Sequence, residues 1–175
     1  MVWGEDALAF KFFVLTNLFD LHLVVSDDDL QFASATIQNS LPYQVFTGIH
    51  KWYFESILLD PSQPKAFPRS LCLELTTPRN ERSVDDPEMV FIHPQSQFYF
   101  NIHDRSCSVS LPPFPENIRF PTRIAFLDSL IATYLDPPTG RINSRLTTFL
   151  KNVDCLSFHM RNELHVFPAG DLEPE

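Results

Sequence analysis

The stretch FDLHLVVSDDD, residues 19 to 29, decides the fold of this chain. Its apolar residues form a nearly continuous run that ends in polar ones, and this pattern predicts a buried strand over residues 19 to 25. Asp20 and His22 interrupt the run two residues apart, so the period of two along a strand places both side chains on one face. The strand therefore carries a carboxylate and an imidazole side by side, which makes this face the first place to look for chemistry.

A helix is expected on each side of this strand. Residues 4 to 15 carry apolar residues at helical spacing, with acidic residues at the start that favour a helix N-terminus. Residues 27 to 39 predict a second helix, capped by Ser26 or Asp27. Its apolar face is expected to consist of Leu30, Ala33 and Ile37. The aspartates at positions 27 to 29 are then explained as caps and first-turn charges of this helix, in preference to a metal site.

Short apolar or alternating runs, separated by proline and glycine, predict strands in the middle of the chain. Residues 70 to 77 alternate clearly, with leucines on one face and Glu74 on the other. Residues 89 to 102 hold two strand-like runs around His93 and Pro94. The other expected strands cover residues 43 to 48 and 51 to 59.

The last third of the chain predicts two helices. The first lies within residues 120 to 136, with Thr122 as its cap after Pro121. Its apolar stripe is expected to consist of Ile124, Leu127, Leu130, Ile131, Tyr134 and Leu135. The second is expected over residues 143 to 160, with an apolar side formed by Leu146, Phe149, Leu150, Val153 and Leu156.

These two helices follow each other after a short proline-rich break, so they are expected to pack as a hairpin. We expect the hairpin to cover the strand at residues 19 to 25, on the face of Phe19, Leu21 and Leu23. The element order predicts one α+β domain over residues 1 to 166, and the polar tail at residues 167 to 175 is expected to be disordered.

The composition excludes several classes of protein. The formal net charge is −9, which disfavours binding to a phosphate backbone. The three cysteines form no C-x-x-C pair, so a disulfide-stapled secreted domain is not indicated. The first residues are acidic where a signal peptide would be basic, and no apolar run approaches about 20 residues. These features predict a soluble intracellular protein, cytoplasmic, with no membrane and no nucleic acid as partners.

The N-terminal part of the chain resembles a known family. GEDALAFKFFV (residues 4 to 14) and FDLHLVVSDDDLQFA (residues 19 to 33) are similar to the opening of the nucleotidyltransferase fold, and especially to fungal nucleotidyltransferase-like proteins. Those proteins run through Gly, a short helix, Asp-x-Asp, LVVPD and an amphipathic helix. The segment from 120 to 150 is similar to their helical end. The resemblance implies a nucleotidyltransferase-like mixed β-sheet with helices on one side and a helical C-terminal end.

The resemblance also assigns roles to four residues. Gly4 takes the place of the turn that receives the nucleotide triphosphate. Asp20 and His22 occupy the Asp-x-Asp position, whose carboxylates hold Mg²⁺ in that superfamily, and Glu74 is the best candidate for the third carboxylate. If the site were active, Asp20, His22 and Glu74 would be catalytic and Asp20 and Glu74 would bind Mg²⁺. An ordinary solvent-facing strand residue is nevertheless the preferred interpretation of Glu74.

The chain departs from the family pattern at the positions that matter for catalysis. His22 stands where the second carboxylate is expected, and imidazole is a poor ligand for magnesium. Glu5 follows Gly4 where a small phosphate-contacting residue is expected, and its carboxylate repels phosphate. The sequence therefore predicts a non-catalytic binding or protein-interaction module without a cofactor, with a protein partner or self-association. The alternative is an active metal-dependent nucleotidyltransferase.

Other candidate sites have a weaker basis. His93, His103, Cys72 and Asp104 lack the spacing of a zinc site. Cys107 lies four residues after His103, which is not the arrangement of a nucleophile and its base. The aromatic residues 98 to 100 could stack on bases, but an aromatic segment of the core is the preferred interpretation.

Overall fold

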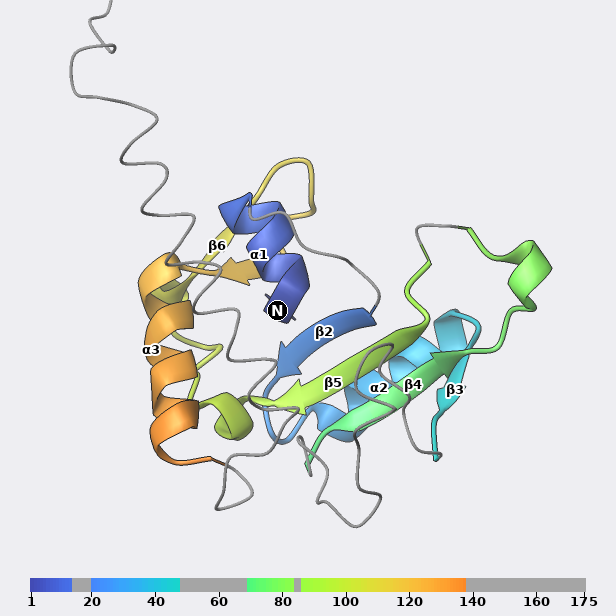
Figure 1. Cartoon of the computed structure of the whole chain (residues 1–175), viewed down its shortest axis with the longest axis horizontal. Helices are drawn as coiled ribbons and strands as arrows, with labels where there is room; N and C mark the ends of the chain where they lie inside the picture. Colours follow the sequence, from blue (N-terminus) through green and yellow to red (C-terminus); the bar gives the residue numbers. More distant parts are fainter. Residues whose placement is uncertain (14–19, 48–68, 84–85, 138–175) are drawn as a thin grey trace, which may run out of the picture.

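The computed structural model describes residues 1–13, 20–47, 69–83 and 86–137, and within them the protein has an α+β fold (Figure 1). A five-stranded mixed sheet has the order β1-β2-β5-β4-β3, and β6 and β7 form a separate pair. The strands are β1 (Val2–Trp3), β2 (Asp20–Val25), β3 (Tyr43–Val45), β4 (Leu71–Leu75), β5 (Met89–Pro94), β6 (Ser108–Ser110) and β7 (Arg119–Pro121). The α-helices are α1 (Gly4–Phe12), α2 (Leu30–Ser40) and α3 (Arg123–Leu135). Three short 3₁₀ helices are η1 (Arg79–Glu81), η2 (Gln95–Phe98) and η3 (Arg105–Cys107).

The centre of the sheet is the parallel pair β2 and β5, and the other neighbouring strands in the sheet are antiparallel. The register places side chains in rows across the sheet. Asp20 is level with Met89, which is in turn level with Glu74. His22 is level with Phe91 on one side and with Trp3 on the other. These rows fix which polar side chains can meet.

One face of the sheet packs against α2. Leu73, Val90 and Ile92 form the buried centre of this layer. Leu21 and Leu23 of β2 contact it from the sheet, and the expected face of α2, Leu30, Ala33 and Ile37, contacts it from the helix. The predicted orientation of this helix is therefore confirmed. Its start differs slightly, because Asp29 rather than Ser26 or Asp27 takes the N-cap position, and its side chain makes no capping hydrogen bond.

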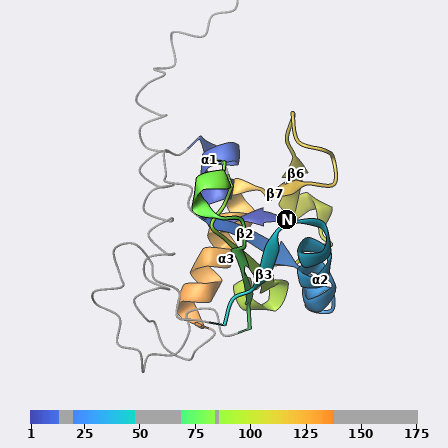
Figure 2. The same cartoon turned by 90° about the vertical axis from the view of Figure 1, so that its right-hand side faces the viewer.

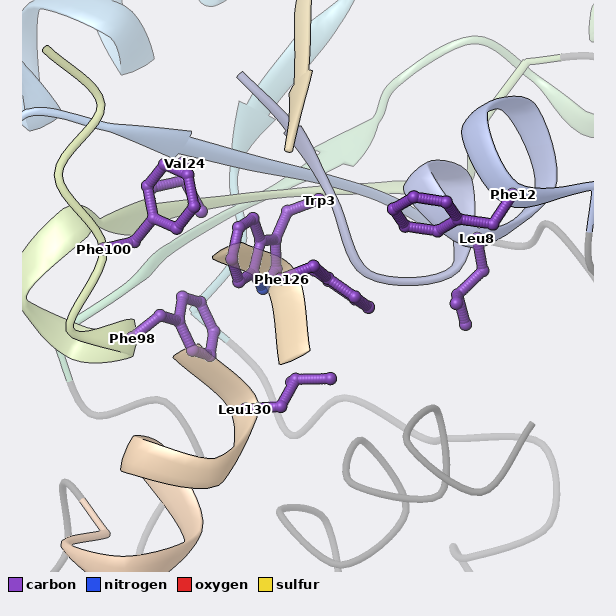
Figure 3. Packing of buried hydrophobic residues seen from close by; sticks show 8 residues of the cluster. All are labelled: Trp3, Leu8, Phe12, Val24, Phe98, Phe100, Phe126 and Leu130. Carbon is purple, nitrogen blue, oxygen red and sulfur yellow. The ribbon is translucent and has the colours of Figure 1, made fainter. Parts of the chain in front are cut away.

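The opposite face packs against α1 and α3 around Trp3 (Figure 3). The Trp3 ring stacks on Phe98 at a centroid distance of 5.4 Å and meets Phe126 edge-on at 4.9 Å. Leu8 and Phe12 of α1 complete this core with Val24, Phe100 and Leu130. Aromatic contacts of this geometry add stability beyond the area that they bury.

Two predictions about the layers are therefore wrong. The helices do not lie on one side of the sheet, since α2 and α3 lie on opposite sides of it (Figure 2). Nor does α3 cover Leu21 and Leu23, because α2 already occupies that face. The alternation along β2 explains both findings, since Val24 and Leu23 must point to different cores, each of which needs its own helix.

The predicted cap of α3 is confirmed, but most of its predicted core face is wrong. Thr122 accepts a hydrogen bond from the backbone N–H of Ala125. The helix buries Phe126, Ser129, Leu130 and Thr133. Of the predicted stripe only Leu130 is fully buried, whereas Ile124 is 75% exposed and Leu135 is 76% exposed. The core side of α3 thus includes two hydroxyl residues, and an apolar stripe lies outside.

The segment after β5 also differs from the expectation. Only the first of the two runs around His93 and Pro94 is a strand, and the second begins as η2. Phe98 and Phe100 are buried in the aromatic core while Tyr99 is half exposed, so the core interpretation of the aromatic segment is confirmed for its two phenylalanines. Tyr99 adopts a left-handed conformation, with φ of 52°, which ends the 3₁₀ turn.

Some predictions fall outside the described residues. These are the strand at 51 to 59, the helix at 143 to 160 and the disordered tail at 167 to 175, together with Phe19. Among the described residues, no helix is both long and apolar enough to cross a membrane.

Candidate functional site

The N-terminus of α1 lies beside the middle of β2. Trp3 is level with His22 in the antiparallel pair of β1 and β2, and Gly4 then turns the chain directly into α1. Gly4 has φ of 61°, a left-handed conformation that costs a residue with a Cβ roughly 1–2 kcal/mol. The first turn of α1 is thereby held against β2, where a carboxylate oxygen of Asp6 accepts a hydrogen bond of 3.4 Å from the backbone N–H of His22.

Three buried or half-buried carboxyl groups gather at this junction. Burial raises the pKa of Asp20 to about 7, and the negative charges of Glu5, Glu88 and Asp6 raise it further. Burial, with Asp6 nearby, raises the pKa of Glu5 to about 7. Burial also raises the pKa of Asp6 to about 6, although the backbone N–H of His22 acts in the opposite direction. Near neutral pH each of these three carboxyl groups is therefore protonated in part of the molecules and negatively charged in the rest.

The junction is consequently unfavourable for an anion. The N-terminus of a helix with a glycine turn can receive a phosphate when its N–H groups face open space. Here Glu5 and Asp6 fill the first turn of α1, and Asp20 is the third acidic group at the junction. A triphosphate placed at Gly4 would meet carboxylates instead of cations.

His22 belongs to a largely buried chain of polar side chains that joins β2 and β5 to the residue before β4. Its Nδ1 lies 2.9 Å from Nε2 of His93 on β5. Nδ1 of His93 lies 2.6 Å from the hydroxyl oxygen of Ser70, which precedes β4, and this hydroxyl lies 3.2 Å from Oε1 of Gln97. His22 and His93 are 1% and 0% exposed. We call these four residues the imidazole chain.

One arrangement of protons satisfies the three shortest contacts in the imidazole chain and leaves the longer contact of 3.5 Å between Gln97 Nε2 and His93 Nδ1 without a hydrogen bond. Gln97 Oε1 can only accept, so the Ser70 hydroxyl donates to it. The Ser70 oxygen then accepts from Nδ1–H of His93. His93 Nε2 is left as an acceptor, and it receives the Nδ1–H of His22. Both imidazoles are neutral in this arrangement, and each holds its proton on Nδ1.

Aromatic packing keeps the imidazole chain dry. The ring of His22 stacks on Phe91 with a centroid distance of 4.9 Å and an interplanar angle of 8°. It is also nearly parallel to the ring of His93. Burial, and then the neighbouring His22, lowers the pKa of His93 well below its usual value. A neutral His93 agrees with the arrangement of protons given above.

Glu74, the predicted third carboxylate, is not brought to Asp20. The row from Asp20 to Glu74 passes through Met89, so the two acidic residues are two strands apart, or roughly 10 Å between backbones. Glu74 instead accepts a hydrogen bond of 2.7 Å from the side chain of Gln44 on β3. The carboxylates whose charges act on Asp20 are Glu5, Glu88 and Asp6.

Sequence reasoning missed Glu88 and His93 as neighbours of this site. Glu88 directly precedes β5, the parallel neighbour of β2, and pairs with Arg82 at 3.6 Å. His93 lay in a predicted strand-like run, whereas Glu88 lay just before it, and the structure brings His93 level with Val24 of β2. What the sequence could not supply was the strand order, which places β5 rather than β4 beside β2.

The residues at the junction do not fit magnesium. Mg²⁺ requires an octahedron of oxygen ligands, and His22 offers an imidazole that already serves the imidazole chain. Within residues 1–13, 20–47, 69–83 and 86–137, no three His, Cys, Asp or Glu side chains are grouped closely enough to hold a metal ion.

The other candidate site residues from the sequence lie in different parts of the fold, or have a pKa that disfavours the reactive form. His93 lies in the imidazole chain, whereas His103 and Asp104 lie beyond η2. The thiol of Cys107 lies 3.5 Å from a carboxylate oxygen of Asp104. Burial and this contact raise the pKa of the Cys107 thiol, which disfavours the reactive thiolate.

Comparisons with protein-family models, with curated proteins and with solved structures found no match to this chain.

Proposed function

We propose that this chain is a nucleotidyltransferase-like module that binds a protein partner or a second copy of itself and does not transfer nucleotides. The order of a glycine turn, a helix, a strand with Asp20 and His22 on one face, and a further helix supports the nucleotidyltransferase-like part of the proposal. The mixed sheet centred on parallel strands is compatible with it.

The observation that carries the proposal is that the His22 side chain is part of the imidazole chain. An imidazole that is hydrogen-bonded to His93 within the imidazole chain joins β2 to β5 and, through Ser70, to the residue before β4. Its role is then architectural, since removing it would leave buried polar groups unsatisfied. Asp20 and Glu5 place two carboxyl groups, both with raised pKa values, at the junction beside Gly4, which disfavours a triphosphate there.

The binding part of the proposal is supported by the described surface. Several large apolar side chains are strongly exposed there, and such residues commonly serve contacts with other proteins. They include Phe13, Phe32 and Leu135. The alternative of an active transferase has no comparable support, because Asp20 and Glu74 are held apart by Met89.

The test is a thermal unfolding series with and without Mg²⁺-ATP, paired with an assay for nucleotide incorporation. We expect no change in melting temperature and no incorporation. A bound ligand at about 100 times its dissociation constant would add about 2.7 kcal/mol to the free energy of unfolding, a shift of several degrees. Asp20→Ala serves as the control. A clear shift with Mg²⁺-ATP that disappears in Asp20→Ala would contradict the proposal and favour the transferase.

A further inference from the structure

The outer face of α3 carries an apolar stripe that the sheet does not use. Ile124, Ile131 and Tyr134 are 75%, 45% and 52% exposed, and Leu127 between them is half-buried. The core side of the same helix is formed by Phe126, Ser129, Leu130 and Thr133. We call Ile124, Leu127, Ile131 and Tyr134 the outer stripe. An apolar surface of this kind on a helix is stable in water only when something covers it.

The spacing in the outer stripe identifies the kind of cover. Its positions are separated by three, four and three residues, which is the a/d pattern of helices that pack along each other. The outer stripe is therefore suited to a second helix that lies nearly parallel or antiparallel to α3.

The same pattern occurs in the sequence beyond the described residues. Within the expected helix at 143 to 160, apolar residues recur at intervals of three, four, three and four. They are Leu146, Phe149, Val153, Leu156 and Met160. Two a/d patterns in one chain, joined by a short connection, are the arrangement of an antiparallel helical hairpin.

The two patterns also agree in register. They mirror each other about Gly140, so that Tyr134 and Leu146, and likewise Ile131 and Phe149, are equally far from it along the chain. Leu127 mirrors Val153 and Ile124 mirrors Leu156. Because both helices rise by the same amount per residue, mirrored positions in an antiparallel hairpin meet side by side.

The connection has a suitable length and composition. α3 ends at Leu135, and the expected helix begins at 143. The residues between include Pro137, Pro138 and Gly140, which prevent one continuous helix. Connections of about two to eight residues are usual between neighbouring antiparallel helices.

We propose that residues 143 to 160 cover the outer stripe of α3 as the second helix of an antiparallel hairpin. This hairpin differs from the one expected from the sequence alone, because its seam is the outside of α3 and not the face that meets the sheet. The apolar pattern of α3 then has two uses, with Phe126 and Leu130 directed to the aromatic core and Ile131 directed to the second helix.

The first test is a cysteine cross-link in the full chain, with Cys72, Cys107 and Cys155 changed to serine. Ile131→Cys with Phe149→Cys joins mirrored positions, and mild oxidation is expected to form a disulfide within one chain. Ile131→Cys with Lys151→Cys is the matched control, since position 151 lies off the seam, and no cross-link is expected. Mass spectrometry and non-reducing gels separate intrachain from interchain products.

The second test compares two charge substitutions in the full chain with its native cysteines. Val153→Asp places a carboxylate in the seam, and we expect a melting temperature lower by several degrees together with increased binding of an apolar dye. Lys151→Asp changes the charge in the same segment by a larger amount, and we expect little change in either measurement.

Two outcomes would overturn the proposal. Equal behaviour of the two cysteine pairs and of the two charge variants would mean that the segment does not cover the outer stripe. An interchain disulfide at Ile131→Cys, with a mass in solution of two chains that falls to one chain in Ile131→Asp, would instead assign the stripe to a second copy.

Discussion

Nδ1 of His22 lies 2.9 Å from Nε2 of His93, and this contact joins the two central parallel strands through their side chains as well as their backbones. His93 also contacts Ser70, which directly precedes β4, so the imidazole chain reaches from β2 to the start of β4. A histidine expected to sit in a degraded metal site is thus one end of the imidazole chain.

Replacement of this histidine by the family residue is the first prediction. His22→Asp should not restore nucleotide transfer, because Glu5 still opposes phosphate at Gly4. It should also lower the free energy of unfolding by about 2–4 kcal/mol, since a new carboxylate is buried and His93 loses its partner. An incorporation assay and urea unfolding measure both effects. Detectable transfer by the single variant would show that Glu5 is not the obstacle.

Asp20→Asn is expected to stabilise the fold in a pH-dependent way. The folded pKa of Asp20 is raised to about 7, above the usual value, so the folded state binds more protons than the unfolded state between about pH 4 and 7. Stability from this group is therefore lost as pH rises through 7. The variant should gain about 1–3 kcal/mol at pH 8 and little at pH 4.

The matched control for this experiment is Glu74→Gln. It removes the same charge from the same row of the sheet, two strands away, where Glu74 contacts Gln44. Urea unfolding at pH 8 should show a gain for Asp20→Asn that Glu74→Gln does not match. An equal gain in both variants would show that the carboxyl junction does not act on Asp20.

His93 should give the opposite dependence on pH. Its pKa is lowered in the folded state, so below the usual value of about 6.5 the unfolded state binds a proton that the folded state does not. Stability from this group is present above that pH and is lost as pH falls. The difference in free energy of unfolding between wild type and His93→Gln should therefore shrink from pH 7 to pH 5. A constant difference would mean that His93 accepts a proton in the folded protein.

Leu130→Ala tests the assignment of the core side of α3. The side chain is 0% exposed, so the cavity left behind should cost about 2–5 kcal/mol in free energy of unfolding. Phe32→Ala on α2 is the control, because Phe32 is 73% exposed and its truncation should cost much less. Equal effects in chemical denaturation would contradict the assignment.

At a net charge of −9 the protein should not bind nucleic acid tightly at physiological salt. A gel-shift titration with single- and double-stranded DNA and RNA checks this. Nanomolar binding that weakens steeply with salt would require a basic surface that the sequence does not indicate.

Local patterns along the chain predicted the helices and strands well, but they predicted poorly which elements pack against each other. The alternation around Asp20 and the spacing of Leu30, Ala33 and Ile37 correspond to β2 and to the buried face of α2. In α3 the more regular apolar stripe lies outside, because the aromatic core around Trp3 accepts Phe126 and two hydroxyl residues instead. The spacing of apolar residues shows which sides of a helix are apolar, but it does not show which of them meets the sheet. In α3 both the buried side and the exposed side carry apolar residues.

The candidate site shows the same limit. Asp20 and His22 share a face as the period of two requires, but the choice of Glu74 as their companion depended on which strand lies next to β2. That neighbour is β5, which brings Glu88 and His93. Strand order depends on contacts between residues far apart in the sequence, and a single sequence does not contain it.

The parallel pairing of β2 with β5 has a consequence for how the chain folds. β2 ends at Val25 and β5 begins at Met89, so the strands that form the middle of the sheet cannot pair until the intervening segment has been made. Closing so long a loop is entropically costly, and non-local pairing of this kind slows folding. During synthesis at about 5–20 residues per second, β2 waits several seconds for its partner. In that interval its unpaired backbone edge and its apolar side chains are open to other chains, so newly made protein should depend on chaperones more than the finished fold does.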